Sequence, residues 1–69
     1  MTDVYREIIR LEREGIGAAL VVVTSVRGHT PQVMGAKMVV RADGSTLGTI
    51  GGGRVEHEAT ARALEAITQ

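Results

Sequence analysis

The stretch Ala18–Val26 reads AALVVVTSV, and it decides the fold of this 69-residue chain. Its first six residues are apolar, and three consecutive valines supply the β-branched side chains that favour extended backbone. Successive side chains of a strand point to opposite faces, so Leu20 and Val22 lie on the face opposite Val21. A strand that is apolar on both faces is typical of a central strand covered on both sides. We therefore predict a central strand over Ala18–Val26.

The residues before this strand are predicted to form a helix. Val4, Ile8 and Leu11 recur at the i, i+4, i+7 spacing of a single helical face. A polar residue at position 2 or 3 is suited to cap the start of the helix, because its side-chain oxygen accepts a first-turn N–H. Gly15 is suited to the left-handed backbone that commonly ends a helix.

Beyond the strand, the sequence predicts a loop and then two more strands. Residues 27–35 (RGHTPQVMG) contain glycine, proline and polar residues, which is typical of a loop. Ala36–Arg41 alternates along the chain, with Met38 on one face and Lys37 on the other. The pair Asp43-Gly44 is a strong signal for a two-residue hairpin turn, and residues 46–50 follow as the returning strand.

Three glycines then lead into a second helix. Gly51–Gly53 precede a helix that we predict from Arg54 to about Thr68, with Glu56 in the first turn, where the helix dipole favours an acid. The order α-β-β-β-α gives an α+β domain: a small, mainly antiparallel three-stranded sheet flanked by two helices.

Chain length sets a limit on the core. A domain of this size buries only about 60% of its unfolded surface, and Tyr5 is the single aromatic residue. Two helices packed on one face of the sheet would leave the other apolar face bare. We therefore predict that the chain associates with a partner as a homodimer or a higher oligomer.

Composition excludes several classes of function. Eight basic residues balance eight acidic ones, which argues against a nucleic-acid partner. The absence of cysteine excludes a disulfide scaffold, a thiolate nucleophile and a cysteine-ligated metal, and it favours a reducing compartment. No signal peptide is visible, and the longest apolar run is far shorter than the ~20 residues that span a membrane. We expect a cytoplasmic protein without a membrane partner.

The glycine-rich stretch Gly48–Val55 (GTIGGGRV) approaches three known motifs and completes none of them. Against the phosphate-binding P-loop, Arg54 stands in place of lysine and Val55 in place of the magnesium-binding hydroxyl. Against the dinucleotide motif G-x-G-x-x-G, Glu56 occupies the third glycine position. The zinc-protease motif H-E-x-x-H fails at Ala61.

A strand that leads through glycines into a helix still has the properties of an anion site. First-turn N–H groups and the helix dipole favour a negative ligand, and Arg54 would add a bidentate donor. The alternative is a tight turn alone, with Arg54 in solvent and Glu56 satisfying the helix start. Both interpretations remain open at this point.

Four stretches together carry a family resemblance. They are Val26–Pro31 (VRGHTP), Gly35–Val40 (GAKMVV), Ala42–Gly44 (ADG) and Gly48–Glu56 (GTIGGGRVE). Their order and spacing resemble the N-terminal domain of the XdhC/CoxI family, and the similarity extends over about residues 18–67.

The resemblance implies a maturation factor for molybdenum hydroxylases such as xanthine dehydrogenase and carbon monoxide dehydrogenase. Such a protein binds the molybdenum cofactor (molybdopterin), protects it while the terminal sulfur is inserted, and delivers it to the apo-molybdoenzyme. We accordingly expect an accessory or chaperone protein and not an enzyme, with no catalytic residue, no metal ligand and no cofactor needed for folding. The residues expected to contact the cofactor are Gly51, Gly52, Gly53, Arg54, Glu56, Arg27, Thr30 and Lys37.

The sequence departs from the family pattern at specific positions. Many members have cysteine after the three glycines, where this chain has Arg54; many also have serine and arginine where it has His29 and Gln32. Most members continue into a Rossmann-like second domain, so we expect residues 1–69 to form a single N-terminal domain without it. Two alternatives remain: a protein–protein interaction module that has lost cofactor binding, or a phosphate- or nucleotide-binding fragment of a larger enzyme.

Overall fold

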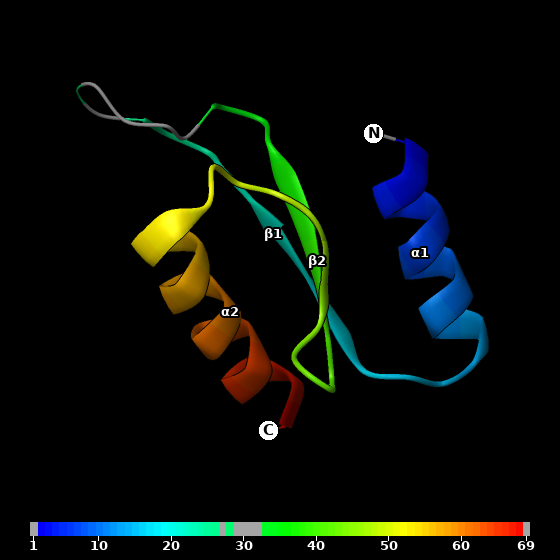
Figure 1. The fold of residues 1–69 in the computed structure, drawn as a ribbon. Helices are drawn as coiled ribbons and strands as arrows, with labels where there is room; N and C mark the ends of the chain where they lie inside the picture. The colour runs from blue at the N-terminus through cyan, green and yellow to red at the C-terminus, as the bar shows by residue number, and fades with distance from the viewer. Residues whose placement is uncertain (1, 27, 29–32, 69) are drawn as a thin grey trace.

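The structure is a computed structural model that describes residues 2–26, 28 and 33–68. Two helices and three strands follow one another in the order α1 (Thr2–Arg13), β1 (Ala18–Val22), β2 (Lys37–Arg41), β3 (Thr46–Gly48) and α2 (Gly53–Thr68) (Figure 1). The α+β class and the order α-β-β-β-α are thus confirmed. No helix within the described ranges is long and apolar enough to cross a membrane.

The sheet is antiparallel, and β2 is its central strand. The prediction that the first strand is central is therefore wrong, because an edge strand is also apolar on both faces when helices cover both. This strand also ends at Val22 and not at Val26. The regular pairing is disrupted just beyond it: Val23 still bonds to Ala36 and Gly35, but Gly35 has a φ of 86° and the Ala36 N–H donates to the Val33 carbonyl at 3.0 Å. The returning strand is also shorter than predicted and ends at Gly48.

The two helices pack on opposite faces of the sheet (Figure 1). Because side chains alternate along β2, Val39 faces α1 while Met38 and Val40 face α2. Buried Val4 and Leu11 of α1 pack on Val39, as their helical spacing predicted. This arrangement corrects the expectation that both helices share one face and leave the other bare.

The uncovered apolar surface is therefore smaller than predicted, but it does not vanish. On the α1 side of β1, Leu20 is 42% exposed and Val22 is 39% exposed. Tyr5 lies close by, because its ring is 6.0 Å from the Nζ of Lys37, and Lys37 pairs with Val22 across the sheet. Ile9, one turn further along α1, is also about half exposed. The partly exposed apolar side chains of α1 and β1 on this face are thus Tyr5, Ile9, Leu20 and Val22.

The turn predicted at Gly15 is confirmed. A hairpin turn also forms at Asp43-Gly44, but its loop has three residues and not the predicted two, because the Arg41 N–H donates to the Ser45 carbonyl at 2.9 Å. Gly15 has a φ of 69°, and the N–H groups of Gly15 and Ile16 donate back to carbonyls of the last turn of α1 at 3.1 and 2.9 Å. At the hairpin, the Asp43 carboxylate accepts hydrogen bonds from the Ser45 hydroxyl and N–H, and these hold the pKa of Asp43 below its usual value. Helix α1 begins at Thr2 and so includes both positions at which a cap was predicted.

An ion pair ties α1 to the sheet and predicts a pH effect. The Glu7 carboxylate accepts from Arg10 at 2.8 Å and from Arg41 of β2 at 2.7 Å, and these guanidinium groups lower the pKa of Glu7 to about 2. A carboxylate with a depressed folded-state pKa contributes stability above its ordinary value of 4.5. That contribution is lost as the pH falls toward 2.

We expect Glu7→Gln to be less stable than the wild type near neutral pH and to lose less stability on acidification. Urea unfolding across the acid range checks this prediction. Glu12→Gln, at an exposed position of the same helix, is the control. Parallel pH profiles for the wild type and Glu7→Gln would show that the ion pair contributes nothing to the acid response.

Candidate functional site

The candidate site lies at one end of the sheet. Because neighbouring strands are antiparallel, β1 ends, β2 begins and β3 ends at this same end. The segment between β1 and β2 and the glycine turn (residues 49–53) both leave the sheet here, and α2 starts here (Figure 1). The topology thus brings the described ends of the β1–β2 segment, the glycine turn and the start of α2 to one end of the molecule.

The glycine turn is organised around one carboxylate oxygen. Oε2 of Glu56 accepts hydrogen bonds from the Thr49 hydroxyl at 2.7 Å, the Gly52 N–H at 2.8 Å and the Ile50 N–H at 3.2 Å. The Thr49 hydroxyl oxygen in turn accepts from the Gly51 N–H at 3.1 Å. These donors, first the Thr49 hydroxyl and then the Gly52 N–H, hold the pKa of Glu56 below its usual value. The turn is therefore held in one conformation by the chain's own anion.

This network decides between the two interpretations of Glu56. The sequence left open whether an external anion or Glu56 would accept hydrogen bonds from these N–H groups. In the structure the Glu56 carboxylate accepts them, so it stabilises the glycine turn and the start of α2. The N–H groups of Gly53, Arg54 and Val55 precede the first intrahelical hydrogen bond of α2, as in any helix. An incoming anion would therefore meet the first turn of α2 and not the interior of the glycine turn.

Arg54 is available to a ligand. Its side chain is 90% exposed and pairs with Glu58 on the next turn at 3.1 Å. Exposed pairs of this kind contribute little to stability, so Arg54 can exchange Glu58 for another anion at small cost.

Lys37 lies at the same end of the sheet but on the α1 face. Its Nζ donates to the Gly35 carbonyl at 2.8 Å. It lines a pocket of about 230 Å³ whose other walls are Asp3, Val4, Leu47, Gly48 and Thr49. The structure therefore gathers five of the predicted residues in the glycine turn and the first turn of α2: Gly51, Gly52, Gly53, Arg54 and Glu56. Lys37 lies apart from them, in a pocket that Thr49 also lines.

The remaining predicted contacts fall outside the described residues. Arg27 and Thr30 lie there, as do His29 and Gln32. Among the residues that are described, no three His, Asp or Glu side chains are grouped closely enough to hold a metal ion.

Sequence reasoning missed Thr49 and Gly48. Thr49 joins the two parts of the site, since it lines the Lys37 pocket and its hydroxyl binds Glu56. Threonine is ordinary in a strand, but a hydroxyl placed two residues before a glycine can accept that N–H, and this spacing was a usable signal. Gly48 has a φ of 84° and ends β3 against the Lys37 carbonyl.

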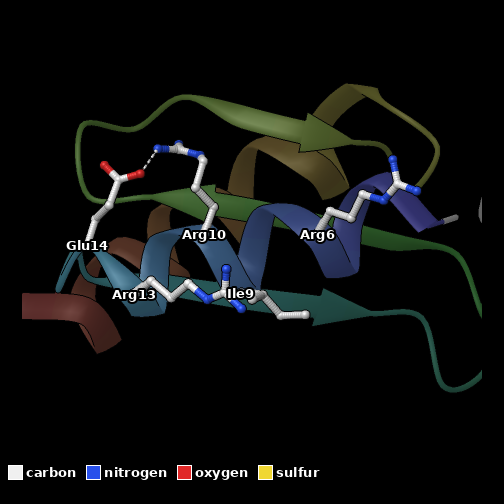
Figure 2. A pocket seen from close by; sticks show the side chains of 5 residues that line it. All are labelled: Arg6, Ile9, Arg10, Arg13 and Glu14. Carbon is white, nitrogen blue, oxygen red and sulfur yellow. Dashed lines mark hydrogen bonds and ion pairs between the residues drawn. The ribbon is translucent and has the colours of Figure 1, made fainter.

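A second, larger concavity of about 460 Å³ lies on the outer side of α1 and contains none of the predicted residues. Its lining is Arg6, Ile9, Arg10, Arg13 and Glu14. Figure 2 shows the Arg10–Glu14 ion pair on one side of the helix, with Ile9 and Arg13 on another. Because Glu7 and Glu14 already hold Arg10, this surface offers a ligand less positive charge than its arginine count suggests.

Comparison with known proteins identifies the family. The chain is 39% identical over 67 residues to the uncharacterized protein YqeB of Escherichia coli K12, covering 97% of the chain and 12% of that protein. It is 44% identical over 69 residues to the molybdenum cofactor insertion chaperone PaoD of the same organism, covering 94% of the chain and 22% of that protein. The chain thus spans less than a quarter of either relative, and no solved structure matches it significantly. Since residues 11–69 match the XdhC and CoxI family, the chain belongs to that family.

Proposed function

We propose that this chain is the cofactor-binding domain of a molybdoenzyme maturation factor. In this role it binds the molybdenum cofactor and delivers it to an apo-enzyme of the xanthine dehydrogenase or carbon monoxide dehydrogenase type. The observation that carries the proposal is family membership together with 44% identity to a molybdenum cofactor insertion chaperone. The first turn of α2, with the exposed side chain of Arg54, supports it.

The proposed site divides its tasks among the eight expected residues. The cofactor carries a phosphate, which suits the first-turn N–H groups of α2 and the exposed guanidinium of Arg54. Glu56 holds the glycine turn in place, and three hydrogen-bond donors of that turn compensate its charge. Gly51, Gly52 and Gly53 let the ligand approach the backbone closely. Lys37, Arg27 and Thr30 complete the proposed contacts with the polar pterin.

Non-covalent binding of the cofactor is suited to a protein that must release it again. The chain has no cysteine, so it cannot supply a thiolate ligand to molybdenum. Binding through hydrogen bonds and charge is reversible, and it leaves the metal without a covalent bond to this chain that delivery would have to break.

Arg54→Ala tests the proposed site without disturbing the fold. Because Arg54 is highly exposed, we expect its removal to change stability by less than about 0.5 kcal/mol. Loss of a charge-assisted contact to phosphate should weaken binding of isolated molybdenum cofactor by about tenfold. Equilibrium titration under anaerobic conditions, monitored by pterin fluorescence, measures this.

Arg13→Ala, at an exposed position near the end of α1, is the matched control and should bind as the wild type does. Equal affinity of the wild type and Arg54→Ala would remove Arg54 from the site. A wild-type chain that does not bind the cofactor at all would reject the proposed function.

One observation favours a second candidate, an interaction module of the same fold. Glu56 already fills N–H groups of the glycine turn that could have held an anion. Such a module would bind the apo-molybdoenzyme and not the cofactor. Titration of the chain with purified apo-enzyme, alongside the cofactor titration, separates the two functions.

A further inference from the structure

The outer edge of β1 offers unpaired main-chain groups. The Val23 N–H donates to the Ala36 carbonyl at 3.0 Å, which makes Val23 a hydrogen-bonded position of the antiparallel ladder. Such positions alternate along a strand, so the N–H and C=O groups of Ala18, Leu20 and Val22 point away from β2. In the described part of the chain, no strand pairs with β1 on that side.

This edge lacks the features that usually prevent edge pairing. β1 reads AALVV, with no charge and no proline, and its register with β2 is unbroken. The opposite edge is protected in the usual way, because β3 has only three residues, two of which are Thr46 and Gly48. The side chains of Leu20 and Val22 add exposed apolar surface to the β1 edge.

We propose that β1 pairs edge to edge with β1 of a second copy of this chain. In an antiparallel pair centred on Leu20, Leu20 lies opposite the partner subunit's Leu20, and Ala18 lies opposite the partner subunit's Val22. This register satisfies every outward N–H and C=O group of β1 and joins the two sheets into a single six-stranded sheet. The inference does not depend on cofactor binding.

Helix α2 supplies an independent reason why the occupant is a second copy. It packs over both β1 and β2, so pairing would bring the two α2 axes to about two strand spacings, roughly 10 Å apart. Packed helices are commonly about 8–10 Å apart, and the distance within this range depends on the side chains at the contact. Leu64 lies on the hairpin side of α2, 3.9 Å from a Cβ placed on Gly44. The helical repeat therefore puts Ala59, Ala66 and Val55 on the side toward the β1 edge.

The facing residues of α2 are suited to this approach. Ala59 and Ala66 are small, and Val55 is an apolar side chain that is 47% exposed in the single chain. A close α2–α2 contact would cover the exposed part of Val55.

The positions of β1 and α2 along the strand direction also agree with a two-fold axis, because one axis can pass near the centre of both elements. A Cβ on Gly17 would lie 2.8 Å from Ile67, and Leu20 lies about 10 Å further along β1 at roughly 3.3 Å per residue. At about 1.5 Å per helical residue, the same distance leads back from Ile67 to about Thr60. A two-fold axis near Leu20 and Thr60 places Glu58 beside the partner subunit's Arg62. The contact is therefore complementary in charge as well as in shape.

Light scattering and a charge-pair exchange test the dimer. We expect the wild type to have twice the 7.3 kDa chain mass at high concentration. Leu20→Lys and Leu20→Glu should each raise the dissociation constant by more than about tenfold, because like charges meet at the symmetry axis. Mixing the two variants should restore a dimer. Thr46→Lys, on the opposite edge, should leave the dimer intact.

Amide hydrogen exchange tests the same contact in the unmodified chain. The Leu20 and Val22 amides should become protected as concentration rises, while the Val21 amide is protected throughout. A monomeric wild type, a dimer that persists in both Leu20 variants, or Leu20 and Val22 exchange that is independent of concentration would each overturn the proposal.

Discussion

Gly48→Ala is expected to destabilise the domain by about 3 kcal/mol or more and to lower Tm by more than about 10 °C. Gly48 has a φ of 84°, a conformation that costs an L-residue about 1–2 kcal/mol. The added Cβ would also lie 2.6 Å from the Lys37 carbonyl oxygen and 3.2 Å from Val4. Because backbone atoms of β2 cannot swing aside as a side chain can, β3 would have to move away from the central strand.

Gly35→Ala is a closely matched control for this prediction. Gly35 has a φ of 86°, but a Cβ there meets no atom within 4 Å. We expect Gly35→Ala to lower the free energy of unfolding by only the cost of the left-handed backbone conformation, about 1–2 kcal/mol. Thermal and urea unfolding of both variants measure the difference. Equal losses would show that the close approach to Lys37 does not matter.

Glu56→Gln is expected to destabilise the domain by about 2 kcal/mol, because three donors lose a charged acceptor. The effect should depend on pH. The folded-state pKa of Glu56 is lowered, so its contribution is present above the ordinary value of 4.5 and is lost as the pH falls through the lowered folded-state value. The difference in stability between the wild type and Glu56→Gln should therefore shrink in acid.

Glu58→Gln, two residues along the same helix, is the control for Glu56→Gln. Glu58 forms only an exposed pair with Arg54, so we expect a change of less than about 0.5 kcal/mol. Urea unfolding at several pH values measures both variants. If Glu56→Gln and Glu58→Gln lower the free energy of unfolding equally, the glycine turn is not held by the Glu56 carboxylate.

Local patterns predicted the elements of the fold well. The spacing of Val4 and Leu11, the glycine at position 15 and the Asp43-Gly44 pair each specify local backbone or a buried face, and the structure confirms all of them. Strand alternation also placed Lys37 on the face opposite Met38, and the structure shows that this is the face covered by α1.

Global arrangement was less accessible from the sequence. An apolar pattern on both faces of β1 predicts cover on both faces, yet Leu20 and Val22 stay about 40% exposed, and the pattern does not reveal whether a strand lies on each side. The same pattern cannot say that α1 and α2 take opposite faces, because either helix presents a single apolar stripe that fits either face.

The site shows the same division. The glycine turn and the helix start were predictable, but N–H groups that suit a phosphate also suit a carboxylate of the same chain. Only the 2.8 Å distance between the Gly52 N–H and Glu56 decides which of the two occupies the turn. Thr49 was missed because its role depends on Glu56, seven residues later.

The most direct test of the proposed function is activation of a purified apo-molybdoenzyme of the xanthine dehydrogenase type by isolated molybdenum cofactor, with and without this chain. We predict that the chain increases the yield of active enzyme above that with free cofactor, and that Arg54→Ala removes most of the increase. A yield equal to that with free cofactor would contradict a role for this chain in cofactor delivery.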